Sequence, residues 1–295
     1  MSGINTIQQK NPNQVKQYQT VQAKSVKPDF IPLVKADTKQ EENISTLSLV
    51  DTLNEQMDAF TKWMDKVTGM DKVKELNKLK DNLIKVMDFN KIEYTADDID
   101  YWAKIIEENS RKSNLSKELL VALVQRETSF RKCIASKTGN GPLQVTSITV
   151  KDLFSDLNGG RLVHYNNMDR QMMDEILYKK DIAGNKVPRF NNYKELHREC
   201  ATNDNLGMKV GIMCFKMKFA EAVASKKGIS IESAINGLKS GEIILSKSEQ
   251  KSLVKRTLVS FNSVFTNEYA SAILDSIARI SPDDELADFN PIVNK

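Results

Sequence analysis

Glycine and proline are scarce in this chain of 295 residues, which has 12 glycines and 7 prolines. All-β proteins need both residue types at their many tight turns, so this scarcity argues against a turn-rich β architecture. Hydrophobic residues make up 40% of the sequence, and the length is sufficient for a substantial core. We therefore expect a mainly α-helical protein.

Cysteine and histidine are also rare. The three cysteines, Cys133, Cys200 and Cys214, show no CxxC or Cys/His spacing. Their odd number leaves room for at most one disulfide, and we expect buried free thiols. His164 and His197 stand alone in the sequence, which favours structural or surface roles for both. The sequence thus predicts no metal site.

Long apolar runs are absent. The longest, LLVALV and VGIMCF, have the size of core segments and fall far short of the ~18 residues of a membrane span. The start, MSGINTIQQKNPNQ, lacks the basic residues and the apolar run of a secretory signal. We expect no membrane span and recognise no signal peptide.

A large excess of one charge is missing too. Lysine and arginine number 43 against 39 acidic residues, a net charge of +4, and the basic residues are scattered. A nucleic-acid-binding protein would concentrate them on one face. We therefore expect no nucleic-acid partner.

The N-terminal part of the chain divides into two segments. Residues 1–44 are rich in Gln, Asn, Lys and Thr and predict a disordered leader. Residues 45–92 carry two apolar stripes at helical spacing, separated by Gly69, which predict a helical hairpin. The first comprises Val50, Leu53, Met57, Phe60, Met64 and Val67, and the second Val73, Leu76, Leu79 (or Lys80), Leu83 and Val86. The hairpin could pack onto the following domain or bind a protein partner.

Residues 93–282 read as one helical domain with a small loop or β element. Thr95 and Ser116 are placed to cap its first two helices. Further helices are expected at 206–224, 231–238, 247–261 and 268–280, with loop and turn at 136–147. The polar region 156–202 is expected to be irregular, apart from a short helix at 172–177 and a loop or small hairpin at 185–188. The acidic tail, 283–295, is expected to fray.

Glu127 has an unusual place in this pattern. Steps of four residues from Leu119 through Leu123 reach Glu127, so its carboxylate falls on the core-facing stripe of a helix. A partly buried carboxyl group keeps its proton to higher pH, as a general acid must. The alternative is an outward-turned side chain, or one paired with Arg126 or Arg131.

Four segments carry a family resemblance. They are Glu127-Thr128-Ser129-Phe130, then Gly141-Pro142-Leu143-Gln144, then NDNLGMKVGIMCF at 203–215, and SFNSVFTNEYASAIL at 260–274. In this order they resemble the Glu-Ser-x-Phe, Gly-Leu-Met-Gln, Asn-Ile/Leu-x-x-Gly and Ala-Tyr-Asn motifs of soluble-type (SLT) lytic transglycosylases. That family belongs to the lysozyme-like superfamily, and the resemblance covers about 180 residues.

The resemblance implies a lysozyme-like domain that cleaves peptidoglycan glycan strands, working in the cell envelope or outside the cell, without cofactor or metal. Glu127 matches the catalytic acid/base. Substrate-binding positions would be Thr128, Ser136, Gly141, Gln144, Phe261, Asn262 and Tyr269. Two residues depart from the family pattern: Thr128 stands for Ser, and Phe261 stands for Tyr and lacks its hydroxyl. The 156–202 segment is also longer than the family's usual spacing.

The implied reaction needs only one carboxylate. Glu127 would protonate the β-1,4 oxygen between N-acetylmuramic acid and N-acetylglucosamine, assisted by the muramic N-acetyl group. It would then take the proton of the 6-hydroxyl and close a 1,6-anhydro ring.

Two other readings stay open. A hydrolase resembling goose-type lysozymes would need a second carboxylate, for which Asp152, Asp156 and Asp204 are candidates. A catalytically weak wall-binding or scaffold protein would rely on the hairpin instead.

Overall fold

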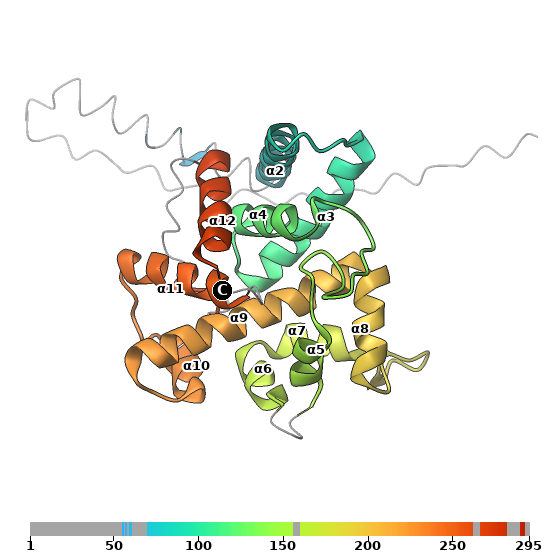
Figure 1. The fold of residues 1–295 in the computed structure, drawn as a ribbon, viewed down its shortest axis with the longest axis vertical. Helices are drawn as coiled ribbons and strands as arrows, with labels where there is room; N and C mark the ends of the chain where they lie inside the picture. The colour runs from blue at the N-terminus through green and yellow to red at the C-terminus, as the bar shows by residue number, and fades with distance from the viewer. Residues whose placement is uncertain are drawn as a thin grey trace, which may run out of the picture. The chain divides into compact units, whose positions relative to one another are not determined.

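The computed structural model describes residues 55, 57, 59–60, 70–155, 160–261, 266–281 and 290–292. Residues Ala59–Lys295 form one compact unit. Its described part contains eleven helices and one small two-stranded sheet (Figure 1). The expected mainly α architecture with a small β element is confirmed. None of the helices in these ranges has the length and apolar character needed to cross a membrane.

Helix α2 (Met70–Phe89) packs against α3, α4 and α12. Leu79, Leu83 and Val86 are buried in these contacts, whereas Val73 in the first turn is exposed. The second predicted stripe therefore serves the domain core through its C-terminal half. This agrees with the reading in which that helix packs onto the domain.

Helices α3 (Ala96–Ser113) and α4 (Lys117–Thr128) begin where the sequence predicts. Thr95 and Asp98 form a reciprocal capping box at the start of α3, and the Ser116 hydroxyl accepts a hydrogen bond from a backbone N–H of α4. The middle of α4 is fully buried. The end of this helix is thus held against the core.

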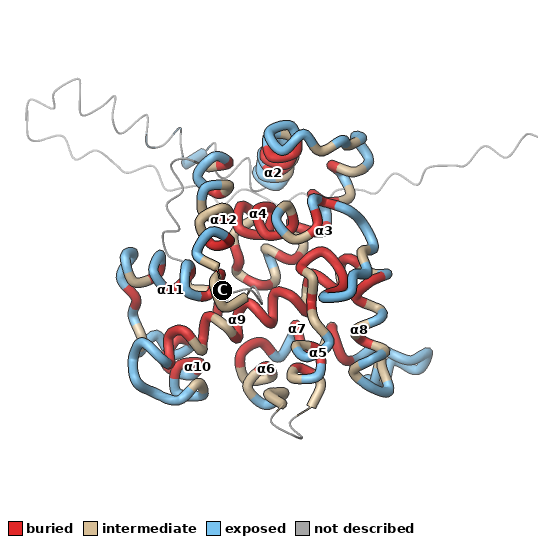
Figure 2. The backbone as a smooth tube through the Cα atoms, viewed as in Figure 1, coloured by how far each residue is buried: buried red, intermediate tan, exposed pale blue. Residues whose placement is uncertain are grey.

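Helix α9 (Asp204–Lys227) runs through the centre of the unit and is buried along most of its length (Figure 2). It contacts α3, α5, α6, α7, α8, α10 and α11. Lys216, fully buried on α9, forms an ion pair of 2.6 Å with the buried Asp169. A buried charge is costly unless it is paired, so this contact ties α9 firmly to the start of α7.

The region 156–202 is more regular than predicted. It contains α6 (Leu162–Met168), α7 (Arg170–Leu177) and α8 (Tyr193–Thr202), and α5 (Ser147–Phe154) precedes it. The short helix at 172–177 is confirmed within α7. The small hairpin is confirmed as β1 (Tyr178–Lys180) paired antiparallel with β2 (Lys186–Pro188).

The prediction of irregular structure in the rest of this region is wrong, because α6 and α8 form there. Helix α6 has seven residues, no side-chain cap, and only Tyr165 and Met168 buried, so its stability comes from packing on α9 and α10. Helix α8 does carry a local signal, since the Asn192 side chain accepts hydrogen bonds from two N–H groups of its first turn.

The C-terminal helices follow the predicted ranges closely: α10 (Ile231–Ser240), α11 (Lys247–Phe261) and α12 (Asn267–Ile280). The prediction that the acidic tail frays is wrong at residues 290–292. Ile292 is fully buried there, and the Asn114 side-chain amide donates a 2.9 Å hydrogen bond to the Asn290 carbonyl.

Several predictions lie outside the described residues. They are the leader 1–44, most of the first hairpin stripe, Asn262, Asp156 and most of the tail. Of the first stripe, Met57 and Phe60 are described, and both are exposed.

Candidate active site

The last turn of α4 presents Glu127. The helix ends at Ser129, and both Ser129 and Phe130 adopt positive φ angles, of 51° and 59°. This reversal drives the Phe130 ring back into the core, edge-on to Trp102, whose indole N–H donates a 2.8 Å hydrogen bond to the Phe130 carbonyl. The anchored turn fixes where α4 ends and how its last turn is rotated, and this sets the direction in which the Glu127 side chain points.

Glu127 is half-buried and accepts a hydrogen bond from the Tyr269 hydroxyl of α12. Burial raises the pKa of Glu127 above its ordinary value, against opposing contributions from the Tyr269 hydrogen bond and the positive charge of Arg126. Tyr269 is itself buried, and its pKa is raised mainly by burial, so it stays a hydrogen-bond donor. Glu127 is therefore held in place and inclined to keep a proton.

The loop between α4 and α5 forms the opposite wall. Gly141 has a φ of +72°, and a Cβ there would lie 2.5 Å from the Cys200 carbonyl oxygen. On α9, a Cβ at Gly211 would lie 2.5 Å from the Cβ of Leu143. Both glycines let the loop press directly onto α8 and α9, a closeness that larger residues would prevent.

Gln144 is fixed within this loop. Its side-chain amide donates a 3.0 Å hydrogen bond to the Gly141 carbonyl, and its Oε1 lies 2.9 Å from the Ser136 hydroxyl. Its backbone φ of 47° is uncommon for a residue with a side chain. Ser136 therefore acts through Gln144, whose side chain is oriented before any ligand arrives.

His197 fastens the same loop to α8. Its Nε2 lies 3.1 Å from the Val145 carbonyl oxygen, and its Nδ1 lies 3.3 Å from the Asn140 side-chain nitrogen. A neutral ring with its proton on Nε2 satisfies both contacts. The structural role expected for His197 is confirmed.

A cavity of about 470 Å³ lies between these elements. Glu127, Gln144 and Phe261 line it together, as three of the predicted site residues. The remaining lining mixes polar and apolar residues and comprises Thr138, Leu143, Val145, Thr146, Thr149, Gly211, Cys214, Lys218 and Ser260. Among the described residues, Glu127 is the one carboxylate in this lining.

Thr128, Ser136, Gly141 and Tyr269 do not line the cavity, and Asn262 lies outside the described residues. Thr128 is buried, and its hydroxyl donates a 3.0 Å hydrogen bond to the Val124 carbonyl of its own helix. Ser136, Gly141 and Tyr269 support residues of the lining without belonging to it. Phe261 packs against Phe215 with ring centres 5.9 Å apart and closes the α11 side.

Sequence reasoning overlooked Cys214 and Lys218. Both follow Gly211 on α9 at steps of three and four residues, which puts all three on one face of the helix. That spacing was available as a signal, but the whole of 206–224 reads as apolar core. Cys200 and Cys214 are buried free thiols, as expected, whereas Cys133 is free and exposed.

Two of the three carboxylates proposed for a hydrolase, Asp152 and Asp204, lie outside the Glu127 cavity. Asp204 is buried, where it accepts hydrogen bonds from the Tyr101 hydroxyl (2.8 Å) and the Cys133 N–H (3.0 Å). Neither Asp204 nor Asp152 lines the Glu127 cavity, and Asp156 is not described. Within the described ranges, no group of three His, Cys, Asp or Glu side chains could hold a metal ion.

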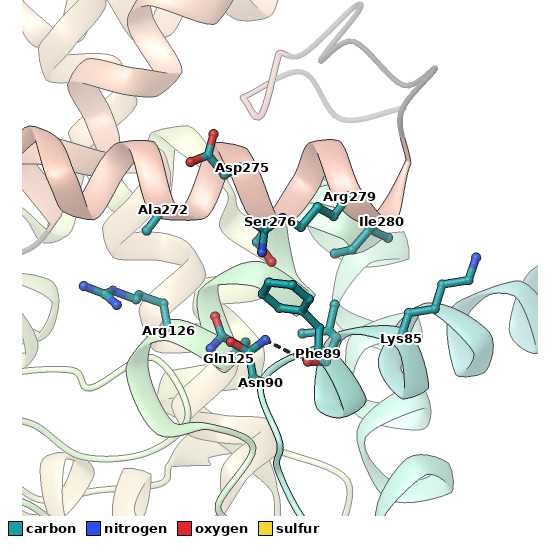
Figure 3. A pocket seen from close by; sticks show the side chains of 11 residues that line it. Lys85, Phe89, Asn90, Gln125, Arg126, Ala272, Asp275, Ser276, Arg279 and Ile280 are labelled. Atoms are coloured by element: carbon teal, nitrogen blue, oxygen red, sulfur yellow. Dashed lines mark hydrogen bonds between the residues drawn. The ribbon is translucent and has the colours of Figure 1, made fainter.

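A second cavity, of about 640 Å³, lies where α2, α4 and α12 meet (Figure 3). Gln125 and Arg126, the two residues before Glu127, line it. The Phe89 ring lies at its centre, with the Arg279 guanidinium 4.0 Å from the ring centre. The described lining holds three cations, Lys85 among them, and one carboxylate, Asp275.

No family model, curated protein or solved structure matches the chain. Its function therefore has to be inferred from the residues of the site.

Proposed function

We propose that the chain is a peptidoglycan lytic transglycosylase with a lysozyme-like helical domain, in which Glu127 is the catalytic acid and base. The observation that carries the proposal is a single carboxylate, half-buried and with a raised pKa, at the wall of a cavity lined by both polar and apolar side chains. Retaining and inverting glycosidases usually use two carboxylates, whereas a substrate-assisted reaction needs one. The family resemblance of the surrounding segments supports the same chemistry.

In the first step, Glu127 donates its proton to the β-1,4 glycosidic oxygen as the bond to the muramic C1 breaks. The muramic N-acetyl group stabilises the positive charge that develops at C1. The raised pKa favours this step, because it increases the fraction of Glu127 that carries a proton near neutral pH.

In the second step, the ionised Glu127 takes the proton of the muramic 6-hydroxyl while O6 bonds to C1. The products are a 1,6-anhydromuramic end and a free 4-hydroxyl on N-acetylglucosamine, and Glu127 is again protonated. The Tyr269 hydrogen bond stabilises the ionised state between the steps. The apolar Phe261 wall disfavours water as the competing nucleophile.

The test is the product profile from purified sacculi, measured by mass spectrometry. The proposal expects anhydromuropeptides from the intact protein and a loss of about 100-fold or more in the Glu127→Gln variant, which cannot donate the proton. Circular dichroism of that variant should match the intact protein. Reducing muramic ends would instead show hydrolysis, and equal product from the variant would overturn the assignment of Glu127.

A further inference from the structure

One face of α9 forms part of the cavity wall and ends in a cation. Gly211, Cys214 and Lys218 follow one another along this face. Lys218 and Glu127 are the only Asp, Glu, Lys or Arg residues of the described lining. When Glu127 holds its proton, the charge presented to the cavity is therefore positive.

Lys218 keeps bonding capacity for a ligand. Its ammonium group lies 3.0 Å from one oxygen of Glu221, and the other oxygen of Glu221 binds Arg161. One carboxylate thus serves two cations, and an ammonium group has three N–H donors. The Lys218 side chain is 33% exposed, so it can reach a ligand.

The other charged groups near this cation lie outside the cavity lining. Asp152 and Arg161, for example, act on Cys214 in opposite directions, but neither lines the cavity. Glu221 is shared with Arg161, and neither residue belongs to the cavity lining. Lys218 is the cation that an entering ligand meets.

We propose that Lys218 forms a carboxylate-binding subsite at the end of the Glu127 cavity and recognises the acidic substituent of the muramic residue. This inference rests on the proposed function. The sugars of the glycan are neutral, and its carboxylates belong to the substituent on the muramic O3. That group ends in a free lactyl carboxylate on stripped strands, or carries the carboxylates of a stem peptide on intact ones.

The experiment measures binding, which does not depend on turnover. Soluble strands of three kinds are titrated against the Glu127→Gln protein: peptide-bearing, amidase-stripped, and stripped with every lactyl carboxylate blocked as a methylamide. Adding Lys218→Gln should weaken binding of at least one of the first two by roughly three- to tenfold, the range for an ion pair at a partly exposed site. Binding of the blocked strands should not change. The strand type that loses affinity identifies the source of the carboxylate.

Lys226→Gln is the matched control. Lys226 lies on the same helix, has a similar exposure of 35% and also pairs with a glutamate, but it does not line the cavity. Lys218→Arg should keep most of the affinity because it keeps the charge.

The inference is overturned if the Lys218→Gln variant binds all strands as tightly as its parent does. It is also overturned if the variant loses as much affinity for the blocked strands as for the others, or if no strand binds. Turnover separates this result from the proposed function. Lys218-dependent binding without anhydro product from the intact protein would overturn the transglycosylase and keep the subsite. Anhydro product from the intact protein, with no effect of Lys218→Gln on binding, would overturn the subsite and keep the transglycosylase.

Discussion

Two cavities lie beside the last turn of α4, and different residues of that turn line each of them. Glu127 lines the first, as its one carboxylate among the described residues, together with uncharged polar and apolar side chains and one cation, Lys218. Gln125 and Arg126 line the second, where one of three cations, Arg279, lies against a phenylalanine that is 61% exposed. The second cavity is the larger of the two, yet its charged residues are exposed.

The contrast shows how burial, more than residue type, sets the chemistry of a site. Arg126 and Arg279 lie in the last turns of α4 and α12, where a cation complements the negative end of the helix dipole. Those cations are therefore explained by the stability of their helices. A carboxylate at the C-terminal end of α4 has no such explanation, and burial shifts its pKa.

The strongest test of the contrast shortens one side chain on each side of the turn. Glu127→Asp withdraws the carboxyl group by one methylene from Tyr269 and from the cavity. We expect about a 100-fold fall in anhydromuropeptide release, because a catalytic group displaced by about 1 Å loses that much. Gln125→Asn makes the same change toward the second cavity and should leave release within about twofold. Equal losses in the two variants would contradict the distinction between the cavities.

A second test moves the wall of the Glu127 cavity. Gly211→Ala would place a methyl group 2.5 Å from the Leu143 Cβ, so the loop that carries Gln144 must shift. We expect turnover to fall about tenfold and the free energy of unfolding to fall by about 1–3 kcal/mol. Gly228→Ala is the control: its φ of +68° makes it strained by about 1–2 kcal/mol, but no atom lies within 4 Å of the new Cβ. Turnover and denaturant unfolding together would show whether lost activity reflects the loop or stability alone.

A third test uses pH. Tyr269→Phe removes a hydrogen bond that favours ionised Glu127, so the pKa of Glu127 should rise further. Because the first step needs protonated Glu127, activity is lost as pH rises through that pKa. The alkaline limb of the pH profile should therefore move to higher pH, while maximal turnover falls up to about tenfold as the carboxyl group loses its support.

Tyr101→Phe is the matched control for this pH profile. It removes the Tyr101 hydroxyl group, which donates a hydrogen bond to Asp204 outside the cavity. The change should cost about 1–3 kcal/mol of stability without moving the pH profile. A shift of the alkaline limb to lower pH in Tyr269→Phe would contradict the assigned role of Glu127.

The smallest effect is expected in the second cavity. Phe89→Ala removes the ring beneath Arg279 and should lower the free energy of unfolding by about 0.5–1 kcal/mol, with turnover unchanged. Calorimetry and the anhydromuropeptide assay measure the two quantities. A clear loss of turnover would mean that the second cavity also takes part in the reaction.

The sequence predicted the features that depend on local geometry. Helix periodicity alone brings Glu127 to the edge of the core, and the caps at Thr95 and Ser116 mark where α3 and α4 begin. The contact of Tyr269 with Glu127 joins residues 142 positions apart, and periodicity carries no information about it. Only the resemblance drew attention to Tyr269.

Misplaced expectations also have physical causes. Thr128 was expected to contact substrate because it occupies the Ser position of the family motif, but a threonine hydroxyl on a helix readily bonds to the carbonyl four residues back. Phe261 was expected to cost the site a hydroxyl group. The structure supplies one to Glu127 from Tyr269, so the substitution leaves the carboxyl group with a hydrogen-bond partner.

The buried pair of Lys216 and Asp169 has a consequence for how α9 settles during folding. A long helix with apolar residues on every side has many nearly equivalent rotational settings, and packing alone discriminates weakly among them. Any setting that separates Lys216 from Asp169 leaves a charge alone in the core. Lys216 lies two residues from both Cys214 and Lys218, on the opposite side of the helix. The ion pair therefore fixes the rotation of α9 about its own axis, and this decides which residues of α9 line the cavity.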